Sequence, residues 1–232
     1  YLPKNMDGAS LPQNTAIAVK AAVLPFSRFR TPEGVVVDSL LSPEMRSTGE
    51  VMGLDTLYDT AFAKAQAGAG SPLPTEGKVF VSVANHDKRN VIIYAKMLEQ
   101  LGFEIVSTGG TADVLRRNGV NSTVASKFAE ANGQHSIVDM VRNGEIDLIL
   151  NTPAGGAARS DGYEIRAAAV SVGCPVMTTI SEFAAAVQAI TALRERSWEI
   201  INLQEHGEFL RTASTGEQGQ DKGEQVREGE LS

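Results

Sequence analysis

The sequence predicts an α/β fold in which helices cover both faces of a parallel sheet. Two observations carry this prediction. Between residues 78 and 195, short and almost continuously apolar strands alternate with helical patterns. Strands of a parallel sheet are buried on both faces, so they show no polar side. In addition, Gly102, Gly119 and Gly144 follow three of the helical patterns, at the position where glycine commonly ends a helix.

Two elements are predicted before this alternation begins. Residues 16–26 (AIAVKAAVLPF) are apolar and partly β-branched and stop at Pro25, which is typical of a strand. No partner strand is evident, so we expect an unpaired apolar edge. Residues 55–70 follow the i, i+3, i+4 spacing of an amphipathic helix. The apolar side chains that define this helix are Leu57, Tyr58, Ala61, Phe62 and Ala65.

The alternating part of the chain then supplies the sheet and its covering helices. The predicted strands cover residues 78–84, 103–108, 122–126, 146–152 and 175–179, with a further candidate at 198–205. The predicted helices cover residues 87–102, 111–119, 136–144, 161–173 and 181–195. Asp87 and Asp161 stand at two of the predicted helix starts, where an aspartate commonly caps the free N–H groups.

Composition divides the chain into segments. Residues 67–77 (AGAGSPLPTEG) are rich in Gly, Pro and Ser, which predicts a linker between one unit at 1–66 and another at 78–206. Residues 207–232 form a mostly polar tail that we expect to be disordered. The chain does not start with Met, and we expect it to be a fragment of a longer protein.

Bulk charge and cysteine content exclude several classes of function. The formal net charge of the 232 residues is −7, so nothing suggests a nucleic-acid partner. We find neither a signal peptide nor an apolar run long enough for a membrane span, so we expect a soluble, cytoplasmic protein. Cys174 is the only cysteine. It cannot form an intramolecular disulfide, and we expect a buried, unreactive thiol.

Polar and cationic residues follow the ends of the predicted strands, where parallel sheets place their ligands. Hydroxyl groups, glycines with accessible N–H groups and cations together suit a phosphate. No dedicated base accompanies them, so the pattern favours binding over catalysis. The candidates for a phosphate-binding pocket are Lys88, Arg89, Thr108, Gly109, Gly110, Thr111, Lys127, Asn151 and Thr152, with Thr178 and Thr179 after the last strand.

Other common sites find no support in the sequence. The three histidines, His86, His135 and His206, are far apart, and no Cys/His spacing matches a zinc site. A Walker-type loop ending in Gly-Lys-Ser/Thr is also missing. We therefore predict neither a metal site nor catalytic residues in this chain.

Longer motifs resemble the large chain of carbamoyl-phosphate synthases. VKAAVLPF (19–26) and SPEMRSTGEVMG (42–53) are similar to the end of that family's second ATP-grasp half. SVANHDK, STGGTA, NGEIDLILNTP and DGYEIRAAAV follow in the order found in its C-terminal allosteric domain. The resemblance implies that residues 78–206 form a methylglyoxal-synthase-like three-layer domain with a five-stranded parallel sheet, preceded by a remnant of an ATP-grasp domain.

The resemblance also implies a regulatory ligand. Domains of this family bind nucleoside monophosphates, and UMP inhibits. Their phosphate-contacting positions match Lys88, Thr108, Thr111 and Lys127 here, and a contact after the fourth strand matches Asn151. A threonine found in some members is Pro153 in this chain, which favours a response to UMP over one to IMP.

A second effector of the family, ornithine, is less expected. The family's glutamate in VKEAVLPF is Ala21 here, and a methyl group cannot pair with an amino group. Asp161 and Thr179 resemble the part of that site contributed by the allosteric domain.

The same resemblance defines what the chain should lack. The ATP-grasp catalytic residues would precede Tyr1, so this chain alone should not make carbamoyl phosphate. The whole protein would be a ligase that uses ATP with Mg²⁺ or Mn²⁺, bicarbonate, and ammonia from a glutaminase small chain. It would serve pyrimidine and arginine biosynthesis. Family members associate through this region, so we expect a homo-oligomer.

Two enzymes share features of the fold. Methylglyoxal synthase requires a GGDQQ-like loop, where AGGAARSDG stands here. IMP cyclohydrolase follows its STGGTA loop with VKTLHPKIHGG, which this chain lacks. Both enzymes remain as alternatives to a regulatory domain.

Overall fold

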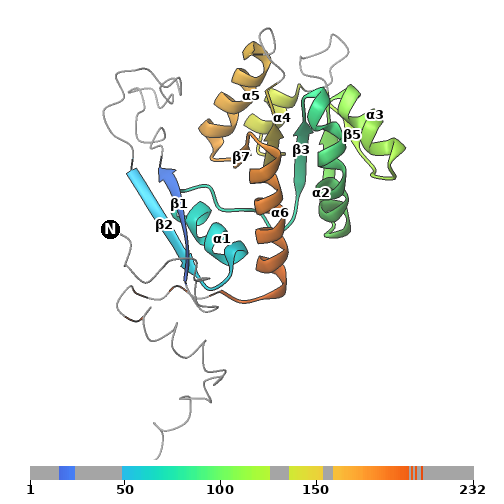
Figure 1. The fold of residues 1–232 in the computed structure, drawn as a ribbon. Coiled ribbons are helices and arrows are strands. Elements are labelled where there is room, and N and C mark those ends of the chain that lie inside the picture. The colour runs from blue at the N-terminus through green and yellow to red at the C-terminus, as the bar shows by residue number, and fades with distance from the viewer. Residues whose placement is uncertain are drawn as a thin grey trace, which may run out of the picture.

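The computed structural model describes residues 16–23, 49–125, 136–153 and 159–198, together with 200, 202 and 205. Of residues 159–161 it describes the backbone alone. Two sheets form within these ranges, a two-stranded antiparallel one and a five-stranded parallel one. Figure 1 shows the small sheet and its helix α1 beside the larger α/β unit.

The larger sheet confirms the predicted fold class. Its strand order is β5-β4-β3-β6-β7, and every neighbouring pair is parallel. Ser82 at the end of the central strand lies opposite Asn151 in the register, so the polar strand ends adjoin one another. The strands are β3 (Lys78–Ser82), β4 (Glu104–Ser107), β5 (Thr123–Val124), β6 (Leu148–Asn151) and β7 (Val176–Met177).

Side-chain alternation along the strands separates two hydrophobic cores. Val81 and Leu150 belong to the core under α2 (Lys88–Gln100) and α6 (Ile180–Glu195). Phe80 and Ile149 belong to the core under α4 (Ile137–Arg142) and α5 (Arg159–Val172). All four side chains are fully buried. This two-sided burial explains why the strands read as continuous apolar runs.

The strand predicted at 16–26 is not an unpaired edge. β1 (Ile17–Val23) pairs along its length with β2 (Gly49–Asp55) in antiparallel register. Helix α1 (Tyr58–Gly68) packs against both strands and against α6. Helix α1 therefore covers one face of the small sheet and contacts the larger unit through α6.

The predicted boundary at 67–77 is crossed by one continuous core. Phe62 and Ala63 of α1, and Leu73 within the segment itself, are buried in the same cluster as Phe183 of α6. The division into units at 1–66 and 78–206 stays a prediction. The predicted tail at 207–232 lies outside the described residues.

Helix boundaries correct two predictions. A short 3-10 turn, η2 (Asn85–Asp87), precedes α2, and the Asp87 side chain makes no capping hydrogen bond. Its carboxylate lies 3.4 Å from His86 Nε2 instead. Asp161 is inside α5, which begins at Arg159, so it is no N-cap. The candidate strand at 198–205 lies largely outside the described residues and stays a prediction. Gly102, Gly119 and Gly144 do adopt the expected positive φ.

Candidate functional site

Five of the predicted phosphate-binding residues, Lys88, Thr108, Gly109, Gly110 and Thr111, lie at the carboxyl ends of β3 and β4. Lys88 begins α2, and its Nζ lies 3.1 Å from the point where a Cβ on Gly110 would stand. Gly110 is in the first turn of helix α3 (Gly109–Arg117). The Lys88 cation therefore lies over the start of α3, as the sequence predicted.

The first turn of α3 leaves two N–H groups available. The extended Thr108 precedes the helix, and its carbonyl accepts the N–H groups of both Thr111 and Ala112 at 2.9 Å. Within the described part of the chain, the N–H groups of Gly109 and Gly110 have no acceptor. Both glycines are exposed. Free N–H groups at a helix start attract anions, so this turn can bind a phosphate.

The two threonines of the loop differ in their surroundings. Thr111 is buried, and its Oγ1 accepts long hydrogen bonds from Val83 N–H at 3.5 Å and from Thr108 Oγ1 at 3.4 Å. Ser82 Oγ lies 3.5 Å from Thr108 Oγ1. The hydroxyl groups thus tie the end of β3 to the start of α3. Thr108, only half-buried, is the more accessible of the two to a ligand.

Asn151 and Thr152, predicted as neighbours in one site, point to opposite faces of the sheet. Thr152 Oγ1 accepts the N–H of Ala84 at 2.9 Å and lines a pocket near α2 and α6. Asn151 follows the alternation of β6 toward α5. Its amide nitrogen is buried and has no hydrogen-bond partner among the described residues. The point where a Cβ on Gly162 would stand lies 3.2 Å from that nitrogen.

Sequence reasoning missed Arg166, which also faces this point. Its Nη1 lies 2.8 Å from the Cβ position of Gly162. The signal was available, because residues four apart on a helix lie on the same face. Asn151, Gly162 and Arg166 therefore converge although the sequence separates them.

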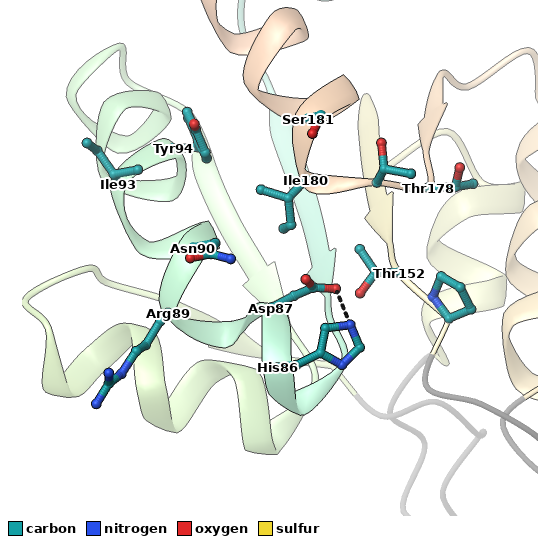
Figure 2. Close-up of a pocket in the computed structure, with 12 residues that line it drawn as sticks. His86, Asp87, Arg89, Asn90, Ile93, Tyr94, Thr152, Thr178, Ile180 and Ser181 are labelled. Atoms are coloured by element: carbon teal, nitrogen blue, oxygen red, sulfur yellow. Dashed lines mark ion pairs between the residues drawn. The ribbon is translucent and has the colours of Figure 1, made fainter.

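A cavity of about 730 Å³ opens beside this edge, between the start of α2 and the start of α6. Figure 2 shows Thr152 and Asp87 near its centre, with Tyr94 and Ile180 among its walls. The cavity is lined by His86, Asp87, Arg89, Asn90, Ile93, Tyr94, Thr152, Pro153, Thr178, Thr179, Ile180 and Ser181. Thr179 also caps α6 by accepting the N–H of Glu182 at 3.2 Å.

Some predicted residues are not placed. Lys127 lies outside the described residues, and so does the side chain of Asp161. Ala21 lies in β1, opposite Val51. Thr179 is in the cavity, but nothing in the described structure joins it to Ala21. The ornithine prediction stays a prediction.

Within the described ranges, no three His, Cys, Asp or Glu residues gather as metal ligands would. No helix in the same ranges is long and apolar enough to span a membrane. Burial, together with the negative charge of Asp147, raises the pKa of Cys174 to about 12. Cys174 is only partly buried, not fully buried as predicted, and its raised pKa fits the predicted low reactivity.

Comparison with known proteins finds similar sequences. Residues 90–178 match the model of the MGS-like domain. The carbamoyl phosphate synthase large chain of Kocuria rhizophila is 64% identical over 222 residues, 95% of this chain and 20% of the relative. That of Pseudarthrobacter chlorophenolicus is 66% identical over 212 residues, which are 90% of this chain and 19% of the relative.

Over at least nine-tenths of its length the chain is similar to carbamoyl phosphate synthase large chains. A more distant large chain, from Streptomyces griseus, is still 53% identical over 91% of this chain and covers 20% of the relative. The chain thus spans about a fifth of the length of its large-chain relatives. The MGS-like match includes Thr108, Thr111 and Asn151 and begins just after Lys88.

Proposed function

We propose that this chain is the regulatory part of a carbamoyl phosphate synthase large chain and that it binds UMP at the start of α3. The observation that carries the proposal is the position of Lys88, whose ammonium group lies over Gly110. It stands beside two N–H groups that have no acceptor within the described structure. This arrangement offers a cation and helix N–H groups to one phosphate.

The arrangement suits binding better than catalysis. Lys88, Thr108, Gly109 and Gly110 provide donors, and no carboxylate within the described residues makes a hydrogen bond or ion pair to any of them. Proton transfer would require a positioned acid or base. A phosphate can therefore be held here, and nothing in this set would act on it.

The activity of the whole protein forms a further part of the proposal. A complete large chain would convert bicarbonate and glutamine-derived ammonia into carbamoyl phosphate in the cytoplasm. It would use ATP with Mg²⁺ or Mn²⁺. A glutaminase small chain would supply the ammonia, and UMP bound here would lower the rate. The support is the match to large chains over 90% or more of this chain. Self-association through this region is also part of the proposal.

Calorimetric titration of the chain with UMP tests the proposed function. We expect one site and a Kd that rises about 10- to 100-fold in Lys88→Ala, because a hydrogen bond to a charged group contributes about 1.5–3 kcal/mol. Lys96→Ala is the matched control, since Lys96 is exposed further along the same helix. Absence of binding, or equal losses in both variants, would refute the proposal.

A further inference from the structure

Exposed apolar side chains gather where the start of α1 meets the end of α6. Leu57 and Tyr58 stand at the start of α1, and Trp198 and Ile200 follow the end of α6. These four are among nine large apolar side chains that are exposed in the described part of the chain, so two short segments carry nearly half of them. An exposed apolar cluster commonly marks a surface that another protein covers.

One ion pair brings the two segments together. Asp59 Oδ2 and Arg196 Nη2 are 3.6 Å apart. Asp59 directly follows the first of these segments, and Arg196 directly precedes the second by two residues. Figure 1 shows the end of α6 beside the start of α1, at the bottom of the view. The apolar side chains around this ion pair form what we call the α1–α6 patch: Leu57, Tyr58, Trp198 and Ile200.

Tyr58 is supported from behind by the core. Its ring centroid lies 6.2 Å from that of Phe62, which is buried in the core shared with α6. The Tyr58 residue itself is still 47% exposed. A ring that is already held in place loses little conformational freedom when a partner covers its exposed side. Tyr and Trp are also enriched at protein interfaces, so both aromatic side chains of the patch suit one.

The charges of the patch match a second copy of the same patch. In a two-fold symmetric contact, the same surface of each copy faces the other. The ion pair supplies one acid and one base, so a two-fold axis can place Arg196 of one copy against Asp59 of the other. Opposite charges then face each other across the contact, which favours the correct pairing of the surfaces. The patch therefore suits a second copy of this chain.

We propose that the α1–α6 patch is the surface through which two copies of this chain associate about a two-fold axis. The inference rests on the proposed function, because it names the surface for the self-association included there. Helix α6 begins just after β7, at the carboxyl edge of the sheet, and its 16 residues end at the patch. The patch is thus about 24 Å from that edge, and association should be separable from nucleotide binding.

Sedimentation velocity of the 232-residue chain at increasing concentration tests the inference. The parent chain should form a dimer. Trp198→Ser and Ile200→Ser should each raise the dissociation constant of the dimer about tenfold or more, because large apolar side chains at the centre of an interface carry much of its binding energy. Val172→Ser is the matched control, since Val172 is exposed on α5, on the opposite face of the larger sheet from α6. Thermal unfolding of each variant confirms that the fold is retained.

Charge reversal tests the two-fold geometry itself. In Asp59→Arg, and likewise in Arg196→Asp, like charges would face each other across the axis, so each variant alone should associate at least about tenfold more weakly than the parent chain. An equimolar mixture of the two variants should form a dimer again, because each copy then offers the charges that the other lacks. A variant that had lost its fold could not regain association in this way.

The outcomes distinguish this inference from the proposed function. A dimer that tolerates Trp198→Ser and Ile200→Ser as well as it tolerates Val172→Ser refutes the inference, and so does a charge-reversed mixture that stays monomeric. A parent chain that is monomeric at every concentration refutes both the inference and the proposed self-association, and leaves the patch to another part of the large chain. Calorimetry with UMP is independent of these results, because binding by a monomeric chain would still support the proposed nucleotide site.

Discussion

The ammonium nitrogen of Lys88 lies 3.1 Å from the point at which a side chain on Gly110 would begin, whereas the same point on Gly109 has open space around it. A side chain added at Gly109 would therefore meet no neighbour, whereas one added at Gly110 would meet Lys88. Only Gly110 is in contact with the cation proposed to bind phosphate.

Gly110→Ala should weaken UMP binding. The added methyl group displaces the Lys88 ammonium and covers an N–H group, so we expect a loss of about fivefold, equivalent to about 1 kcal/mol or one ordinary hydrogen bond. Calorimetry measures the effect. Gly109→Ala is the matched control and should bind nearly as well as the parent chain. Equal losses in the two variants would show that the Lys88 contact has no special role.

The Asp55–Lys64 ion pair should stabilise the small sheet against α1. Asp55 Oδ2 and Lys64 Nζ are 2.8 Å apart, and both side chains are mostly buried. Lys64→Met should lower the free energy of unfolding by about 2 kcal/mol, because it leaves a buried carboxylate unpaired. Urea unfolding at neutral pH provides the measurement. Lys20→Met should change little, since the exposed Lys20–Glu50 pair is worth less than about 1 kcal/mol.

The contribution of Asp55 should also depend on pH. Burial by itself would raise the pKa of Asp55, but hydrogen bonds from Lys64 and from the N–H of Leu57 outweigh burial and hold it below the ordinary value. A carboxylate whose pKa is lowered by folding stabilises the folded state at pH values above its unfolded pKa of about 3.9. This stabilisation is lost as the pH falls through the folded-state pKa. The stability gap between the parent chain and Lys64→Met should therefore narrow below about pH 4. A gap that stays constant down to pH 2 contradicts this reasoning.

Gly53→Ala should destabilise the chain strongly. A Cβ on Gly53 would overlap the carbonyl oxygen of Ala61 and stand 2.6 Å from the backbone nitrogen of Ala65. Backbone atoms cannot rotate away, so we expect a loss near the upper end for overpacked cores, about 3 kcal/mol in urea unfolding. Gly68→Ala is the control, because its Cβ would meet Val51 at an ordinary 3.5 Å. If Gly53→Ala were as stable as the control, β2 and α1 would not pack as described.

Cys174 should react slowly while the chain is folded. Its pKa of about 12 leaves almost no thiolate at pH 8, and the thiolate is the reactive form. We expect reaction with a thiol-specific disulfide reagent to be at least tenfold faster in urea than in buffer. Equal rates in the two solutions would mean that Cys174 is accessible in the folded chain.

Local patterns predicted the larger sheet well and the small one poorly. Continuous apolar runs such as KVFVS and LILN correspond to β3 and β6, because burial on both faces leaves a clear mark in the sequence. The pairing of β1 with β2 joins residues such as Val19 and Gly53, and such distant partners leave no local pattern. Asp87 was misjudged because it lies in the 3-10 turn η2 with a helical backbone, whereas a capping residue is typically extended.

The candidate site shows the same limits. Lys88 and Gly110 were predicted to lie in one site, and the Lys88 ammonium group does lie over Gly110. Asn151 and Thr152 point in opposite directions because side chains alternate along a strand. The prediction grouped them because both follow the same strand, without applying this alternation. The spacing of Gly162 and Arg166 places them on one helix face, but their proximity to Asn151 becomes evident only when α5 is placed beside β6.

The most direct test of the central claim is an NMR titration of the ¹⁵N-labelled chain with UMP. The amide signals of Gly109 and Gly110 should shift and saturate at one equivalent of UMP, because their N–H groups would bind the phosphate. Unchanged signals from both glycines at saturating UMP would contradict it. Shifts confined to Ile93, Tyr94 and Ser181 would contradict it as well, because they would place the nucleotide in the cavity between α2 and α6.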